Sequence, residues 1–293
     1  MWRTSILLVA AIACVYANSL GGSFHFDDAH SLVENPHIRS LANAPRFFWD
    51  PACFSYNPEH AMYRPLLLVT YALNYAVGGY DVTGWHVANV GIHGLNACLI
   101  SWVGVLLGLP GLWAGLLFAL HPLVSEPVNY LSARSESLCA LFVLATLALH
   151  LKGSRWAWLT FAAALLCKEV AVVTPGLLWL VDRYQSRGIS WRDRGLPRPV
   201  RRLFGLRLHV WRVPMLSLSW RRWWPYGALT LGYLSVLMAT GFLGASLAEP
   251  VRSMDVQIPY QLAVLPLYLR MFLLPWGLSV EHLLPMPLWF WCA

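Results

Sequence analysis

The chain has 293 residues, of which 58% are hydrophobic and only 12% are charged, and it contains sixteen tryptophans. Apolar stretches recur along its length, and with spans of about 20 residues each the chain has room for about seven or eight crossings. This composition excludes a soluble domain and predicts an all-α polytopic membrane protein. The six cysteines show no short spacing typical of a metal site, so neither a disulfide framework nor a zinc site is indicated.

The net charge of +7 is concentrated in one segment, residues 183–222, which contains eleven arginines. By the positive-inside rule this segment is a cytoplasmic loop. Nucleic-acid binding is the other explanation of a basic run, but Trp191, Leu203 and Trp211 are interleaved as in an interfacial helix. We therefore expect the bilayer surface as the partner of this loop, and no nucleic acid.

The spans are counted from Arg3, which places the amino terminus on the inner side. They are 5–21, 85–108, 112–130, 135–151, two short spans between 156 and 181, and then 224–243 and 260–276. The two short spans are separated at Lys168-Glu169, because a charged pair near the bilayer centre costs several kcal/mol. Segment 63–79 is expected to be interfacial or re-entrant. Six spans then separate the amino terminus from the basic segment, so both lie on the inner side. The loop 22–84, which follows the first span, therefore faces the exterior.

Two adjacent acids, Asp27 and Asp28, follow the first span. A carboxylate at a membrane face can take the proton from a hydroxyl that attacks a lipid-borne substrate. Neighbours on a non-helical loop point in different directions, so one acid could act as base while the other positions the acceptor. The alternative is structural, since Asp-Asp-Ala-His-Ser is also a plausible amino-terminal cap of a short helix.

The same span count places a second group of polar residues on the outer face. They are His121, Glu126, Arg134, Glu136, Lys168 and Glu169. A later motif, Ser279-Val280-Glu281-His282, should be cytoplasmic by the number of spans that precede it. A helix broken at one of the nearby prolines could instead return the chain to the outer side. Its side is left open.

Several short motifs follow one another along the chain. They are Gly22 to Arg39 with Phe-Asp-Asp and Glu-Asn-Pro, Tyr63-Arg64-Pro65-Leu66, Trp85-His86-Val87-Ala88-Asn89, His93, Leu120-His121-Pro122 through Glu126, Arg134-Ser135-Glu136-Ser137-Leu138, Cys167-Lys168-Glu169, Tyr268-Leu269 through Pro275, and Leu278-Ser279-Val280. In order and spacing they resemble the membrane half of the transmembrane and tetratricopeptide-repeat O-mannosyltransferases and their bacterial relatives. The resemblance runs from about residue 20 to residue 282.

The resemblance implies an inverting glycosyltransferase of the GT-C class. Such an enzyme takes a sugar, here mannose, from a polyprenyl-phosphate carrier and transfers it to a hydroxyl of a protein or glycan acceptor. The lipid-linked sugar is then a co-substrate, no other cofactor is expected, and a divalent metal is left open. The enzyme would be multi-pass, in the bacterial inner membrane or the endoplasmic reticulum, with its active face periplasmic or lumenal. The first acid of the pair, Asp27, is implied as the base.

The departing lipid phosphate needs cations that stay charged at a partly dry interface, for which the planar fork of arginine is suited. The candidates are Arg64, Arg134, Lys168 and Arg270. We favour Arg134 and Lys168, whereas Arg64 could instead fix the interfacial helix against Glu126 or Glu136. The acids Glu126, Glu136 and Glu169 are expected as supporting residues, and His121 as either a structural histidine or a phosphate contact.

Three alternatives stay open. Family members continue into further spans and a repeat array, whereas this chain has no 34-residue repeat up to Ala293. The chain is therefore expected to be truncated, or to bind its acceptor through another part. An inactive scaffold is the further alternative. A small permease would also be polytopic, but should carry its charges near span centres. Residues 1–17 could be a signal peptide, or a lipoprotein signal ending at Cys14.

Overall fold

The computed structural model describes residues 2–186, 220–242 and 254–275. Every regular element in these ranges is a helix, which confirms the all-α class. The α-helices are α1 (Trp2–Val15), α2 (Pro65–Gly78), α3 (Val82–Leu106), α4 (Gly111–Leu120), α5 (Glu126–Asn129), α6 (Arg134–Leu151), α7 (Ala157–Leu165), α8 (Thr174–Ser186), α10 (Trp220–Ala239) and α12 (Met254–Leu273). The short 3₁₀ and π turns are η1 (Ala17–Gly21), η2 (Ala29–Val33), η3 (His37–Arg39), η4 (Leu41–Phe48), η5 (Pro51–Phe54), η6 (Pro58–His60), η7 (Pro122–Val124) and η8 (Glu169–Val173).

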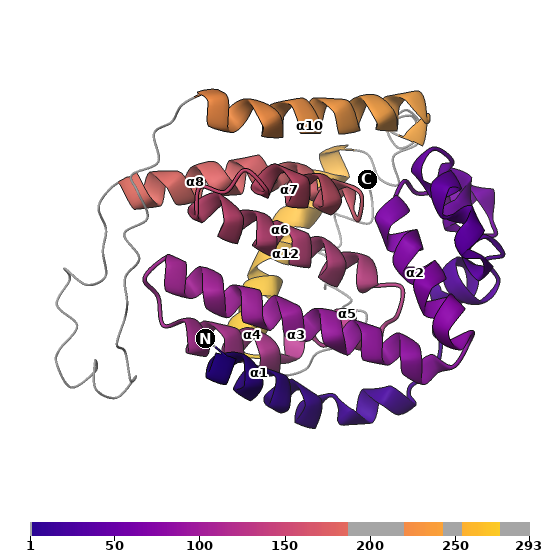
Figure 1. Ribbon diagram of the computed structural model, residues 1–293, viewed down its shortest axis with the longest axis horizontal. Helices are drawn as coiled ribbons and strands as arrows, with labels where there is room; N and C mark the ends of the chain where they lie inside the picture. The colour runs from indigo at the N-terminus through magenta and orange to yellow at the C-terminus, as the bar shows by residue number, and fades with distance from the viewer. Residues whose placement is uncertain (1, 187–219, 243–253, 276–293) are drawn as a thin grey trace.

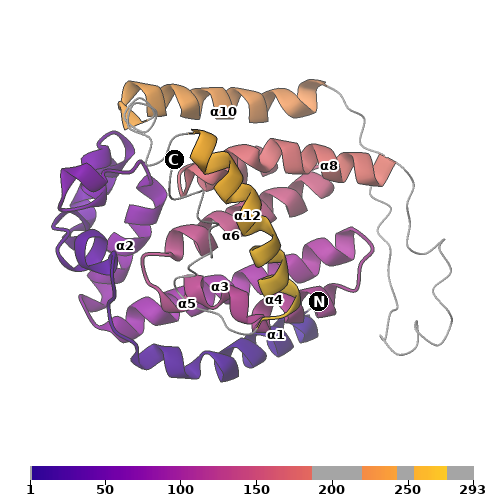
Figure 2. The same cartoon turned by 180° about the vertical axis from the view of Figure 1, so that it is seen from behind.

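The long helix α3 lies at the centre and packs against α1, α4 and α6. Helix α7 packs against the other side of α6, and α10 lies over α7 (Figure 1). Helix α12 crosses the other helices obliquely, as the view from behind shows most clearly (Figure 2). The short helices of the loop after α1 gather beside α2 at one end of the long helices in both views.

Helices α3 and α4 approach each other closely through small residues. A Cβ atom added at Gly111 would lie 2.2 Å from the carbonyl oxygen of Ser101, and one at Gly115 would lie 3.0 Å from the carbonyl oxygen of Ala97. The two glycines are four residues apart and therefore share one face of α4. This is the small-xxx-small pattern by which helices pack without a hydrophobic driving force in a bilayer.

The loop 22–84, which the sequence predicts on the outer side, is a packed layer of short helices. Leu32, Ile38, Phe47 and Phe54 are buried in the same apolar core as α2. The side-chain amide of Asn35 donates to the carbonyl oxygen of Cys53 at 3.1 Å and to that of Phe54 at 3.0 Å. The loop therefore has the internal contacts needed to hold a side chain in a fixed position.

Two described helices, α3 and α6, are long and apolar enough to cross a membrane by length and composition. The apolar helices α1, α2 and α4 are shorter. The expected span 112–130 is wrong as one helix: α4 ends at Leu120, His121 is extended with ψ of 123°, and η7 and α5 follow. The cause is Pro122, which disfavours helical geometry in the residue before it. Helix α4 has ten residues and is thus about 15 Å long.

The break expected at Lys168-Glu169 is confirmed. Helix α7 ends at Leu165, Lys168 is extended with φ of −161°, and α8 begins after the turn η8. Most of the basic segment 183–222 and the motif Ser279-Val280-Glu281-His282 lie outside the described residues.

Candidate active site

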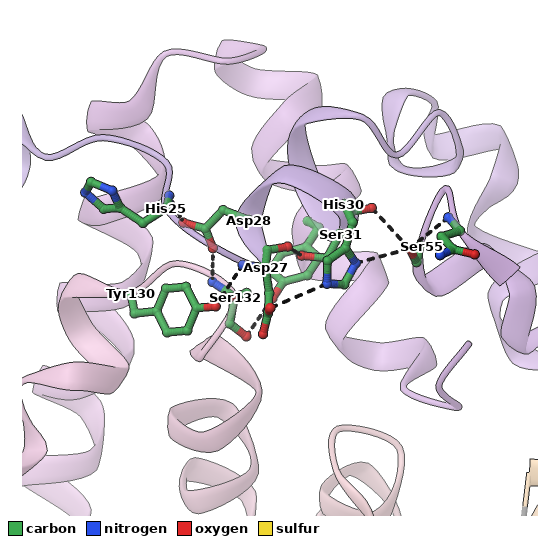
Figure 3. A network of polar contacts seen from close by, with 10 residues as sticks. His25, Asp27, Asp28, His30, Ser31, Ser55, Tyr130 and Ser132 are labelled. Atoms are coloured by element: carbon green, nitrogen blue, oxygen red, sulfur yellow. Dashed lines mark hydrogen bonds and ion pairs between the residues drawn. The ribbon is translucent and has the colours of Figure 1, made fainter. Parts of the chain in front are cut away.

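The two acids lie in the turn between η1 and η2, whose polar contacts are drawn in Figure 3. Phe26, directly before them, has φ of +46°, and it is the one residue other than glycine with positive φ in the described ranges. Such a backbone is rare for a bulky side chain and persists only where the surroundings hold it, which is typical of functional sites. The Phe26 ring meets the ring of Tyr130 edge to face, with centroids 6.3 Å apart.

Asp28 is completely buried and anchors this turn. Its Oδ1 accepts the backbone N–H of Ser132 at 2.7 Å, and its Oδ2 accepts the backbone N–H of His25 at 2.9 Å. Burial raises the pKa of Asp28 above the ordinary 3.8, while the hydrogen bonds from His25 and Ser132 act in the opposite direction. Asp28 precedes η2 but makes no capping hydrogen bond to it, which removes the helix-cap explanation for this residue.

Asp27 points the other way, and 69% of its side chain is exposed. Its backbone is fixed, because its N–H donates to the Tyr130 hydroxyl at 2.9 Å and its carbonyl accepts the Ser31 hydroxyl at 2.6 Å. Its carboxylate Oδ1 lies 3.7 Å from Nε2 of His30, whose Nδ1 lies 3.1 Å from the buried Ser55 hydroxyl. Asp27 is thus an accessible carboxylate on a firmly held backbone (Figure 3).

The segment before α6 joins this turn to the helices. Ser132 binds Asp28 through its N–H, and its carbonyl oxygen accepts the hydroxyl of Tyr71 in α2 at 3.1 Å. Tyr71 is buried and interacts electrostatically with both Asp28 and Arg64. Through Ser132 the acid turn is therefore tied to Tyr71 of α2, the helix that Arg64 directly precedes.

The structure does not bring Arg134 to a surface where a phosphate could bind, contrary to what we favoured from the sequence. Its side chain is 1% exposed and donates to the amide oxygens of Asn89 at 2.6 Å and Asn74 at 2.9 Å, and to the Trp85 carbonyl at 3.1 Å. The guanidinium also lies over the rings of Tyr71 and Trp85. These contacts fix α2 and α3 to the start of α6, so the arrangement favours a positioning role.

The other cations form two ion pairs side by side. Arg64 pairs with Glu169, with Nη2 at 3.0 and 3.2 Å from the two carboxylate oxygens, and Lys168 pairs with Glu136. The alternative that Arg64 is held by Glu126 or Glu136 is therefore wrong, because the turn at η8 presents Glu169 to it. A longer contact of 3.5 Å joins Arg64 to the Ser135 hydroxyl.

The remaining predicted residues are not members of these pairs. His121 is mainly structural: its Nε2 lies 2.9 Å from the Phe272 carbonyl in α12, and its Nδ1 accepts the N–H of Leu123. Arg270 is exposed on α12 and Glu126 is exposed at the start of α5. Neither forms an ion pair within the described ranges.

Sequence reasoning missed several residues that hold the site. They are Tyr130, Ser132, His30, Ser55, Tyr71, Asn74 and Asn89. Of these only His30 and Asn89 belong to motifs quoted above, in Gly22 to Arg39 and in Trp85-His86-Val87-Ala88-Asn89. The contact of Asp27 with Tyr130 joins residues 103 positions apart, and no local pattern indicates such a contact.

Comparison with curated proteins gives clear relatives. The chain is 31% identical to "Protein O-mannosyl-transferase TMTC4" of Homo sapiens over 219 residues, which covers 62% of this chain and 29% of the relative. It is 34% identical to "Protein O-mannosyl-transferase Tmtc1" of Drosophila melanogaster, covering 63% of this chain and 23% of that protein. The chain is a sequence relative of the TMTC O-mannosyl-transferases. This confirms the resemblance read from the motifs.

The chain spans less than a third of the length of these relatives, with 29% of the human protein and 23% of the fly protein covered. A third relative, from Caenorhabditis elegans, is 34% identical over 161 residues. No protein-family model matches the chain, and no solved structure matches it.

Proposed function

We propose that this chain is an inverting membrane glycosyltransferase of the GT-C class. It transfers mannose from a polyprenyl-phosphate carrier to a hydroxyl, of a protein serine or threonine, at the outer or lumenal face. The observation that carries the proposal is the contrast between the acids: Asp28 is buried and anchors the turn, whereas Asp27 is exposed on a fixed backbone. The name of the relatives, protein O-mannosyl-transferase, supports the sugar and the acceptor.

Asp27 acts as the general base. Its carboxylate takes the proton of the acceptor hydroxyl as the oxygen attacks the anomeric carbon of the sugar, a contribution typically of about 10²- to 10⁴-fold. The bond between that carbon and the phosphate oxygen breaks with its electron pair, so the lipid phosphate departs with an added negative charge. The acceptor keeps the sugar with inverted configuration, and Asp27 returns its proton to solvent because it is exposed.

Lys168 and Arg64 receive the departing phosphate. Arg64 directly precedes α2 and Lys168 directly precedes the turn η8. On the outer side that the sequence predicts, both would meet a lipid-borne phosphate, which arginine can bind through two parallel hydrogen bonds. Arg134 holds α2, α3 and the start of α6 in place. It thereby supports Ser132, two residues earlier, which binds Asp28.

The chain would sit in the membrane as a multi-pass protein, in the bacterial inner membrane or the endoplasmic reticulum. Helices α3 and α6 support this placement. In this proposal α1, α4 and the broken pair α7 and α8 contribute further crossings of a GT-C arrangement, while α2 stays interfacial or re-entrant. No further cofactor takes part in the proposed reaction.

The test is a transfer assay with the full chain reconstituted in vesicles. Polyprenyl-phosphate mannose and a peptide rich in serine and threonine are supplied, and the anomeric configuration of the product is read by NMR. We expect mannosyl peptide of inverted configuration, and no transfer from a nucleotide-linked mannose. Retained configuration or use of the nucleotide sugar would contradict the proposal, and no consumption of either donor would favour a scaffold.

A further inference from the structure

The two ion pairs of Arg64 with Glu169 and Lys168 with Glu136 are layered by depth. The cations are the deeper members, with side chains 10% exposed for Arg64 and 19% for Lys168. The carboxylates are the outer members, 41% exposed for Glu169 and 48% for Glu136. Each deep cation is thus covered on its solvent side by an acid.

As they stand, these four residues do not form an anion site. Their charges sum to zero, and Glu169 accepts hydrogen bonds from both Nε and Nη2 of Arg64, which are the donors a phosphate would use. A phosphate can reach the cations only by replacing the carboxylates. The two carboxylates are exposed to solvent and can leave, and the phosphate then supplies the counter-charge that the deep cations need.

We propose that Glu136 and Glu169 are exchangeable covers of the donor-phosphate site. The polyprenyl phosphate displaces them from Lys168 and Arg64 when it binds, and they return to the cations when it leaves. This inference rests on the proposed function and concerns the same site. It assigns the two acids a role in donor affinity and product release that differs from that of Asp27.

The chemistry of the reaction gives the covers a purpose. The donor is a phosphate diester with one negative charge, whereas the departing lipid phosphate is a monoester whose second ionisation occurs near pH 6. Two uncovered cations would therefore hold the product more tightly than the substrate. Carboxylates that compete for the same cations lower the affinity for both ligands and so limit retention of the product.

The test uses farnesyl phosphate as the probe, with the full chain in lipid nanodiscs and tryptophan fluorescence as the readout. Glu136→Gln and Glu169→Gln should each bind the probe about two- to fivefold more tightly, since each removes one competitor worth up to about 1 kcal/mol. Lys168→Gln should bind it more weakly. The control is Glu59→Gln, because Glu59 is an exposed acid of the loop 22–84 and forms no ion pair in the described ranges.

A general change in surface charge would shift all three glutamate variants equally, and this would overturn the inference. Weaker or unchanged binding of the probe by both Glu136→Gln and Glu169→Gln would also overturn the inference. The proposed function would still stand in that case if the wild type binds the probe and Lys168→Gln binds it more weakly. Failure of the wild type to bind the probe would contradict both. Thermal unfolding with and without farnesyl phosphate checks each variant, and we expect the probe to stabilise the two cover variants more than the wild type.

Discussion

Asp28 and Arg134 are buried charged side chains whose hydrogen bonds all go to neutral groups. The carboxylate accepts two backbone N–H groups, and the guanidinium donates to amide and carbonyl oxygens. Neither forms an ion pair within the part of the chain described here. Buried charges satisfied by neutral dipoles hold geometry, since removing one leaves its partners unpaired.

The anchoring role of Asp28 predicts a difference between two substitutions. Asp28→Ala leaves the backbone N–H groups of His25 and Ser132 unpaired and should lower the free energy of unfolding by about 1 to 3 kcal/mol per group. Asp28→Asn keeps one of the two acceptor oxygens, so it leaves one of these N–H groups unpaired and should cost less than the alanine variant at pH 7. Thermal unfolding in detergent measures both, and equal stability of the alanine variant would contradict the anchoring role.

The raised pKa of Asp28 predicts a pH dependence with a definite sign. The folded protein holds this proton more tightly than the unfolded chain, so the contribution to stability is complete below pH 3.8 and is lost as the pH rises through the folded-state pKa. The melting temperature of the wild type minus that of Asp28→Asn should therefore increase when the pH is lowered from 7 to 4. A difference that stays constant or decreases would show that burial is not the dominant influence.

The two cations that the sequence favoured for phosphate binding should behave differently. Arg134→Lys cannot reproduce the fork that meets Asn89, Asn74 and Trp85, and should lower stability by about 2 kcal/mol or more. Lys168→Gln breaks a partly exposed pair, and should cost at most about 1 kcal/mol while raising the KM for the lipid-linked donor. Full stability of Arg134→Lys would return Arg134 to the list of phosphate contacts.

At the scale of the helices, boundaries that follow from local chemistry could be predicted from the sequence. The break at Lys168-Glu169 follows from the cost of a charged pair in a bilayer, and it is observed. The end of α4 before Pro122 was missed because hydrophobicity alone made 112–130 a single span, although the proline is a visible signal. The pairing of α3 with α4 needs both helices at once, and only the spacing of Gly111 and Gly115 hints at it.

The close approach of α3 and α4 can be tested with two glycines. Gly111→Ala places a methyl group 2.2 Å from the Ser101 carbonyl oxygen and 2.7 Å from Val105 Cγ2, so it should push the helices apart and lower the melting temperature. Gly91→Ala in α3 is the matched control, because nothing lies within 4 Å of its added Cβ atom. That change should leave stability equal or raise it by up to about 1 kcal/mol, through better helix propensity. The reverse order would contradict the observed packing.

For the whole molecule, the sequence predicts one outer face that carries the chemistry, and long-range contacts decide what that face contains. Asp27, Asp28 and Lys168 could be singled out because acids and cations beside spans are chemically conspicuous. Their separation into a buried anchor, an exposed carboxylate and a paired cation could not be predicted, since it depends on Tyr130, Ser132 and Glu136, which are distant in sequence.

The common outer face expected from the sequence predicts the outcome of cysteine labelling in sealed vesicles. In a chain cleared of its own cysteines, single cysteines placed at Glu59 and at Pro122 should react with a membrane-impermeant reagent from the outside. Cysteines within 192–212, which lie outside the described residues, should react only after the membrane is opened, by the positive-inside rule. Labelling of Glu59 and Pro122 from opposite sides would disprove a common face.

The most direct measurement of the central proposal compares Asp27→Asn with Asp28→Asn and the wild type in the transfer of mannose from polyprenyl-phosphate mannose. The amide at position 27 keeps the shape of the side chain and cannot accept the proton, so transfer should fall by at least about 10²-fold. Asp28→Asn should lose less, because the buried residue does not touch the acceptor. A cooperative melting transition above the assay temperature in each variant would show that both variants fold. Full activity of folded Asp27→Asn would contradict the proposal that Asp27 is the base.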